Sequence, residues 1–283
     1  MKRFRTFLLS LFFLAIALPV EIKAQDHPFG DGEKLTYKLH YKWGVINADV
    51  AVLSFDLKEE KYGDIPCFHL VTKGATSNLA AALVKVQYNY DSRFAVSDLA
   101  PLVFYREQTE GSYWARNNYT WSDGGKCLKA HVDKSTRPVR DTVFKADKVI
   151  YDVITMLYEV RAADLDAVKG GRTIHIMCAL DCNVNDVYIS YVKAENKKVS
   201  GIGTVATDKY MLRVIPRKGA EQLDKESVIA VSSKGEELAP IYLWITPDAS
   251  RTIAAFSTAI AVGKINGTLT GANGLKCPLT PID

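Results

Sequence analysis

Aromatic side chains are the residues of this sequence that are best suited to holding a ligand. Tyrosine and tryptophan have flat, weakly polar faces, which stack on sugars or line apolar cavities. They are concentrated in the first half of the 283-residue chain. We select six candidate ligand contacts: Tyr41, Trp43, Tyr88, Tyr90, Trp114 and Trp121. A purely structural interpretation is also open, because β-strands favour aromatic residues whether or not they bind anything.

Carboxylates offer a second kind of chemistry. Two of them on either side of a glycosidic bond can serve as the acid and as the base or nucleophile of a hydrolase. The candidates for such a pair are Asp31, Glu33, Asp152, Glu159, Asp164 and Asp166. Sequence does not give their separation in space, on which the mechanism depends. The simpler interpretation places Asp152 at a helix terminus, and Asp164 and Asp166 in a solvated turn.

Cysteines allow one covalent link to be considered. The chain has five of them, so at least one thiol has no partner within the chain. Cys178 and Cys182 are close enough in sequence to form a disulfide across a turn, although closing so short a loop would add little stability. The alternative is that both are small buried thiols.

Patterns typical of metal, phosphate and nucleophile sites are missing or incomplete. Asp181-x-Asn183-x-Asn185 begins like a calcium loop, but Asp186 stands in place of the required glycine and Val192 in place of the bidentate glutamate. The segment is better interpreted as a hairpin turn. The five histidines show no metal-ligand spacing, and neither a Gly-x-Ser-x-Gly elbow nor a phosphate-binding glycine loop occurs. We therefore predict no metal, no cofactor and no catalytic residues, although a triad assembled from distant residues stays open.

One segment, residues 149–171, has the hydrophobic period of a helix. Its apolar residues follow the i, i+3, i+4, i+7 spacing that places side chains on one helical face: Ile150, Val153, Ile154, Leu157 and Val160. A glycine pair at its end stops any continuation. We predict a single helix here, which connects two β-rich halves.

The sequence on both sides of this helix is typical of β-strands. Residues 35–43 are the clearest case, since leucine, tyrosine and tryptophan alternate with lysine, threonine and histidine. This period indicates a half-buried antiparallel strand. Further alternating segments are separated by turn residues. The predicted fold is mainly β, an antiparallel meander with one central helix.

The first 24 residues have the layout of a secretory signal peptide. Lys2, Arg3 and Arg5 precede an apolar run over residues 7–20, and Ala24 offers a cleavage point. The run is shorter than the roughly 20 residues that span a bilayer, so we predict export and no transmembrane segment after cleavage. Without this segment the formal net charge of +4 falls to about +1. So small a charge gives no electrostatic argument for a nucleic-acid partner or for an anionic membrane surface.

Four stretches together resemble one bacterial family. The opening PFGDGEKLTYKLHYKWGVINADVAVL is similar to the F-x-x-G-E-x-L-x-Y-x-x-x-Y-G-x-x-x-A pattern of the exported proteins known as domain of unknown function 3108. Three later stretches agree, DLAPLVFYRE, YDVITMLYEVRAADLDAVKGG and IYLWITPDASRTIAAFSTAIAVGKINGTLTG. The chain departs from the pattern in reading Trp43-Gly44 where a bare glycine turn is usual, and in lacking a proline after Arg251. Neither departure alters the expected fold.

The resemblance implies a YmcC-like, all-β meander folded into two half-barrels with a helix between them. The half-barrels are expected at residues 25–148 and 172–283, and the helix at 149–171. The resemblance implies no established activity and no catalytic residues. It also implies the periplasm or cell envelope of a Gram-negative, Bacteroides-like bacterium, by analogy alone.

These observations favour one function over two others. We expect an exported, non-enzymatic, monomeric protein that binds an apolar or glycan ligand, or an envelope protein partner, on the concave face of a half-barrel. The alternatives are a hydrolase that acts on envelope glycans through paired carboxylates, and a structural scaffold with a fully packed interior.

Overall fold

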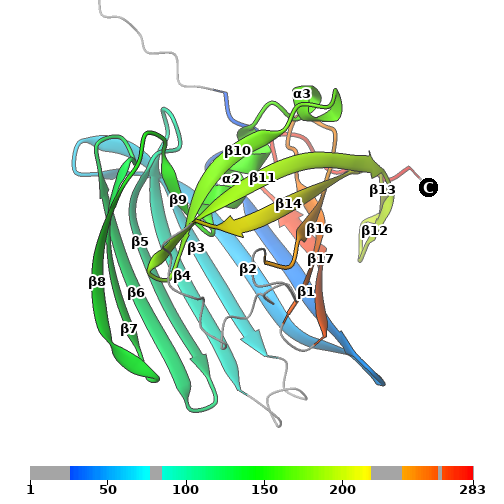
Figure 1. Ribbon diagram of the computed structural model, residues 1–283. Coiled ribbons are helices and arrows are strands. Elements are labelled where there is room, and N and C mark those ends of the chain that lie inside the picture. The colour runs from blue at the N-terminus through cyan, green and yellow to red at the C-terminus, as the bar shows by residue number, and fades with distance from the viewer. Residues whose placement is uncertain (1–25, 77–84, 218–237, 261–262, 283) are drawn as a thin grey trace, which may run out of the picture.

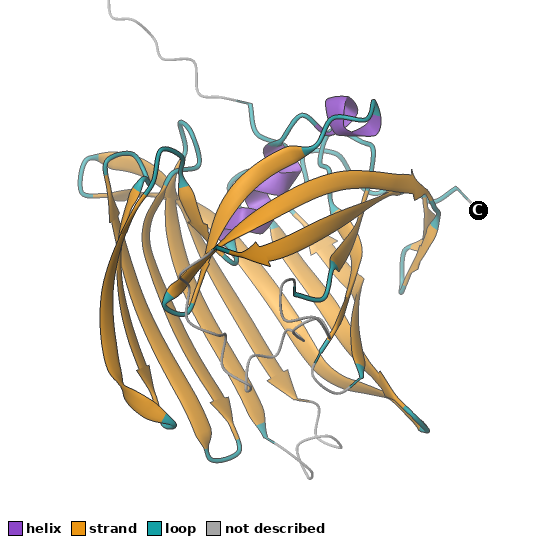
Figure 2. Cartoon of the chain, in the orientation of Figure 1, coloured by secondary structure: helices purple, strands orange, loops and turns teal. Residues whose placement is uncertain are grey.

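The computed structural model describes residues 26–76, 85–217, 238–260 and 263–282. The predicted signal segment, residues 1–24, lies outside the described residues. Fifteen strands form one curved sheet, in the order β8-β7-β6-β5-β4-β3-β2-β1-β17-β16-β15-β14-β11-β10-β9 (Figures 1 and 2). The predicted mainly-β, antiparallel fold is confirmed.

The N-terminal half is a meander in which each strand pairs antiparallel with the next. Its strands are β1 (Lys34–Trp43), β2 (Ile46–Tyr62), β3 (Ile65–Thr76), β4 (Val86–Ala95), β5 (Pro101–Glu110), β6 (Tyr113–Ser122), β7 (Cys127–Lys134) and β8 (Arg137–Lys145). In β1 the predicted alternation is present, because Leu35 and Tyr37 are buried while Lys34 and Lys38 are exposed.

The C-terminal half continues the same sheet, because the last strand pairs antiparallel with β1. Its strands are β9 (Ile150–Asp152), β10 (Ile174–Leu180), β11 (Asn183–Ala194), β14 (Asp208–Pro216), β15 (Ile241–Ile245), β16 (Ile253–Ala259) and β17 (Lys264–Asn273). Strands β12 (Lys197–Val199) and β13 (Gly203–Val205) form a separate small sheet. Strand β9 departs from the meander, since it pairs parallel with β10.

The predicted single helix over residues 149–171 is wrong in its extent. Its first turn is replaced by strand β9, and two short helices follow, α2 (Thr155–Ala162) and α3 (Leu165–Lys169). Asp152 sets the start of α2, because its carboxylate accepts the backbone N–H groups of Ile154 and Thr155, both at 2.9 Å. Apolar spacing alone cannot separate a short buried strand from the beginning of a helix.

Helix α2 lies on the concave side of the sheet, between two groups of buried side chains (Figure 2). Tyr158 packs with the group that contains Phe68 of the N-terminal half. Val160 packs with the group that contains Leu243 of the C-terminal half. Each fully buried side chain of this kind contributes about 1.5–3 kcal/mol. The helix therefore joins the two halves through the core.

Candidate functional site

The concave side of the sheet holds an apolar cavity of about 230 Å³. Strands β1 and β2 form one wall with Leu35, Tyr37 and Phe55, and α2 forms a second wall. Strands β10, β11, β14, β15 and β16 form the third. An engineered apolar cavity of about 150 Å³ in another protein binds benzene. The cavity is therefore large enough for a small apolar ligand.

The lining residues differ in exposure from one side of the cavity to the other. Leu35 and Leu243 are buried, whereas Leu53, Ile241 and Thr258 are half-buried. The half-buried residues come from β2, β15 and β16, so the cavity is more accessible on the side where these three residues lie.

Asn185 is a polar exception in this apolar lining. It is 1% exposed, and its Nδ2 donates to the backbone carbonyl of Cys178 at 3.3 Å. Its Oδ1 has no hydrogen-bond partner among the residues that the structure describes. A buried acceptor without a partner costs about 1–3 kcal/mol. A ligand that carries a hydrogen-bond donor would satisfy this atom.

Arg161 also reaches the cavity wall, but its guanidinium is fully engaged in the core. It forms a two-bond ion pair with Glu33, with both N–O distances at 2.7 Å, and it also donates to the backbone carbonyls of Ser250 and Arg251. The Tyr158 hydroxyl donates to the same carboxylate at 3.0 Å. Such complete pairing is what a buried ion pair requires. The pair fixes α2 against β1 and the β15–β16 turn, so its role is to hold the wall of the cavity.

Asp152, a candidate for the hydrolase mechanism, is buried in a structural role. Besides the two backbone N–H groups at the start of α2, it accepts the hydroxyl protons of Ser92 and Thr155 at 3.0 and 2.6 Å. Burial raises the pKa of Asp152, although these hydrogen bonds favour the carboxylate. The predicted location at a helix terminus is confirmed.

The other candidate carboxylates occupy separate surroundings. Asp164 caps α3 and Asp166 is exposed. Asp31 accepts a backbone N–H of β2 at 2.9 Å. Burial raises the pKa of half-buried Glu159. In the described part of the chain, no side-chain hydrogen bond links any two of the six candidates.

Three of the six predicted aromatic contacts lie together on the concave face. A row of rings crosses β4, β5 and β6, in the order Tyr88, Tyr90, Phe104, Tyr119 and Trp121. Successive ring centroids are 6.2, 6.0, 5.4 and 5.8 Å apart. Tyr119 is 2% exposed, so the middle of the row belongs to the core and does not offer a stacking surface.

The other three aromatic candidates lie elsewhere. Tyr41 and Trp43 are at the C-terminal end of β1, where Trp43 is 53% exposed. Trp114 lies on the opposite face of the sheet, with the Arg116 guanidinium 5.1 Å from its ring centroid. None of the six predicted residues lines the cavity, whereas Tyr37 does. The alternation within β1 could have identified Tyr37, because it shares a face with Tyr41.

The candidate disulfide between Cys178 and Cys182 is not formed, and both cysteines are buried free thiols. Cys178 lies in strand β10 and lines the cavity. Cys182 lies in the following two-residue turn, with its thiol toward the backbone carbonyl of Arg140 on β8. The two side chains therefore belong to different core clusters. Burial raises the pKa of Cys178, which keeps it a neutral thiol and a poor nucleophile.

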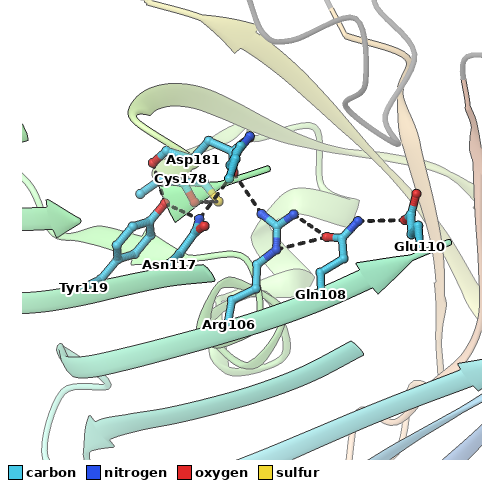
Figure 3. A network of polar contacts seen from close by, with 9 residues as sticks. Arg106, Gln108, Glu110, Asn117, Tyr119, Cys178 and Asp181 are labelled. Carbon is cyan, nitrogen blue, oxygen red and sulfur yellow. Dashed lines mark hydrogen bonds and ion pairs between the residues drawn. The ribbon is translucent and has the colours of Figure 1, made fainter. Parts of the chain in front are cut away.

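A buried polar network joins the turn between β10 and β11 to strands β5, β6 and β7 (Figure 3). Asp181, in this turn, accepts from Arg106 Nη1 at 3.0 Å, from Asn117 Nδ2 at 3.3 Å and from Lys134 Nζ at 2.6 Å. The Tyr119 hydroxyl donates to the backbone carbonyl of Asp181. The hairpin tip is thereby attached to the concave face of the other half.

The charge state of Asp181 follows from these contacts. Burial alone would raise its pKa, but the nearby Arg106 and Lys134 cations hold the pKa below its ordinary value. The network continues along β5, where Arg106 donates to Gln108 and Gln108 Nε2 donates to Glu110 at 2.7 Å. Both buried cations are thus paired with the single carboxylate of Asp181. We assign this network to joining the two halves of the sheet.

Two further findings concern other kinds of site. Among the described residues, no group of three or more histidine, cysteine, aspartate or glutamate side chains could hold a metal ion. Within the same residues, no helix is both long enough and apolar enough to cross a membrane.

A curved antiparallel sheet around a central helix and an apolar cavity defines a barrel-like β protein. The chain belongs to the family described as "Protein of unknown function (DUF3108)", which matches residues 36–270. The predicted family is confirmed.

A similar fold is found in a solved structure. The protein is similar to the "Beta-barrel-like Protein of Domain of Unknown Function DUF1849 from Brucella abortus", with a TM-score of 0.54 and 8% sequence identity. The match covers 88% of this chain and 99% of that chain. At this identity the likeness concerns the fold alone. No curated protein sequence matches this chain.

Proposed function

We propose that this protein is a non-enzymatic, monomeric binding protein of the cell envelope, which holds an apolar ligand in the cavity beside α2. The observation that carries the proposal is the cavity of about 230 Å³ with its apolar walls. A structural scaffold would be expected to fill this space, because protein interiors are normally close-packed. Export is supported by the signal-like layout of residues 1–24.

The lining favours an apolar ligand over a glycan. A glycan site needs aromatic faces open to the ligand, together with several polar groups. The aromatic row on β4–β6 is largely within the core, while the cavity presents mainly aliphatic side chains. Asn185 adds one unpartnered acceptor, so the best-fitting ligand is an apolar body with a single hydroxyl or N–H donor.

The proposal is tested by blocking the accessible side of the cavity. Leu53 is half-buried in the cavity wall, and Leu53→Trp would fill space there. The probe is N-phenyl-1-naphthylamine, an apolar dye with one N–H group, whose fluorescence rises in apolar surroundings. We expect L53W to weaken dye binding about tenfold or more, a loss of about 1.4 kcal/mol.

The matched control is the neighbouring residue of the same strand. Val52 is 48% exposed and faces away from the cavity, so Val52→Trp adds the same ring outside it. V52W is expected to bind the dye as the unmodified protein does. Equal binding by both variants and the unmodified protein would refute the cavity as the ligand site. Native mass spectrometry of protein purified gently from its producing cells would then identify any retained ligand by the mass lost on denaturation.

A further inference from the structure

The hairpin between β1 and β2 ends in exposed apolar side chains. Trp43 is 53% exposed, Val45 is 101% exposed and Ile46 is 42% exposed. Figure 1 shows this hairpin, in blue, projecting at the end of the sheet opposite helices α2 and α3. We define residues 43–46 as the apolar tip.

Folding does not explain the residue types of the apolar tip. Gly44 and Val45 form its two-residue turn, and Gly44 has the positive φ of 53° that glycine tolerates. Val45, at the second position, does not have a positive φ, so its backbone accepts many residue types and does not require valine. Because Val45 is fully exposed, its side chain adds nothing to the core. The apolar character of the tip is therefore available for a contact outside the molecule.

Positive charge surrounds the apolar tip. Lys42 and Lys264 are register partners of β1 and β17, and both are exposed. Neither forms an ion pair with any residue that the structure describes. The carboxylate on the neighbouring part of β2, Asp49, is paired with Lys38 at 3.1 Å and His40 at 2.9 Å. The tip thus carries apolar side chains, and immediately behind them lie two cations that no carboxylate in the described part of the chain neutralises.

We propose that the apolar tip docks the protein on an anionic membrane surface. Trp43, Val45 and Ile46 enter the interface between headgroups and acyl chains, and Lys42 and Lys264 contact the anionic headgroups. Apolar burial and electrostatic attraction add in peripheral membrane binding. The arrangement fits a lipid surface because its charges lie one residue behind the apolar side chains, at headgroup level.

The apolar tip and the cavity share strand β1. Its concave-face residues run from Leu35 and Tyr37, in the cavity wall, through Leu39 and Tyr41 to Trp43. Docking by the tip would therefore bring the strand that forms one cavity wall to the lipid surface. The docking proposal does not rest on the proposed ligand, and its experiment uses no cavity probe.

The experiment measures co-flotation of the full chain with vesicles of phosphatidylethanolamine and phosphatidylglycerol, and with neutral phosphatidylcholine vesicles. The unmodified protein is expected to bind the anionic vesicles, and less so as salt concentration rises. Trp43→Ser combined with Val45→Ser should reduce the bound fraction about tenfold. Lys42→Gln combined with Lys264→Gln should remove the preference for anionic vesicles.

The control removes exposed apolar side chains at a different place. Val139 and Val143 on the edge strand β8 are 52% and 56% exposed. The variant with serine at both positions should co-float with vesicles to the same extent as the unmodified protein. All variants keep the same N-terminus, so any contribution of residues 1–24 is common to them. Val45→Ser alone is a second test, because a fully exposed side chain can be changed without affecting folding.

Two results would overturn the proposal. One is equal flotation of the unmodified protein and both tip variants. The other is no binding of the unmodified protein to anionic vesicles, which would direct the search to a protein partner for the tip or to a second copy of this chain.

Discussion

Replacing Asp181 by asparagine should destabilise the protein strongly. The amide is nearly the same size as the carboxylate, but it leaves Arg106 and Lys134 without their shared anion. Those residues are 9% and 4% exposed, so water cannot take the place of the lost partner. Breaking a buried ion pair from one side costs about 3–5 kcal/mol. We expect D181N to lower the free energy of unfolding by that amount at neutral pH.

The loss of stability in D181N should depend on pH. An unfolded aspartate has a pKa of about 3.9, and the folded pKa of Asp181 is lower. A depressed pKa means that the carboxylate stabilises the fold above the unfolded value, and that this stability is lost as pH falls through the folded pKa. The difference between the unmodified protein and D181N should therefore be constant near neutral pH and shrink below about pH 4.

Urea unfolding followed by tryptophan fluorescence measures both effects, because urea is uncharged and does not screen ion pairs. The control is Asp141→Asn, which removes the carboxylate of the His131–Asp141 pair at 2.8 Å, where the Asp141 side chain is 78% exposed. It should cost at most about 1 kcal/mol. If D181N costs no more stability than D141N, or if its cost does not change with pH, the ion pairs of Asp181 do not stabilise the fold.

Two further predictions concern the cavity walls. In β17, Gly267→Ala would place a Cβ within the space of the Phe256 ring, so we expect a loss of about 1–3 kcal/mol in urea unfolding. Gly271→Ala, whose Cβ would have its nearest atom at 3.7 Å, should change little. Similar unfolding midpoints for the two alanine variants would contradict this packing. Asn185→Leu removes the unpartnered acceptor, so the free energy of unfolding should be unchanged or rise by about 1 kcal/mol. Binding of N-phenyl-1-naphthylamine by this variant should weaken, whereas binding of pyrene, which has no hydrogen-bond donor, should not. Equal effects on both dyes would exclude a hydrogen bond from the ligand to Asn185.

The strands were predicted well from the sequence, because buried and exposed side chains alternate along a half-buried strand. The strand at residues 35–43 is such a case, since Leu35 and Tyr37 face the core while Lys34 and Lys38 face solvent. The helix was predicted with the wrong extent because Ile150 is buried in strand β9 and Val160 in helix α2. Both residues satisfy an apolar pattern, but only the cap formed by Asp152 separates the two elements.

The cavity could not be predicted, because its walls come from opposite ends of the chain. Tyr37 and Ile253 both line it, and the Tyr37 hydroxyl donates to the backbone carbonyl of Ile253 at 2.8 Å. The buried network did leave a signal in the sequence. Arg106 occupies the same face of β5 as the buried Phe104, so a charge lies on an apolar face and requires a partner. That signal indicates a buried ion pair without identifying Asp181.

The pairing of β1 with β17 determines when the sheet can be completed during folding. Lys34 and Asn273 are register partners, so one of the central ladders joins residues at opposite ends of the polypeptide. Such long-range pairing raises contact order and slows folding. Because the chain is made from its N-terminus, the N-terminal meander is available first, with one edge of β1 unpaired. Until β17 arrives, that exposed edge is open to pairing with another chain.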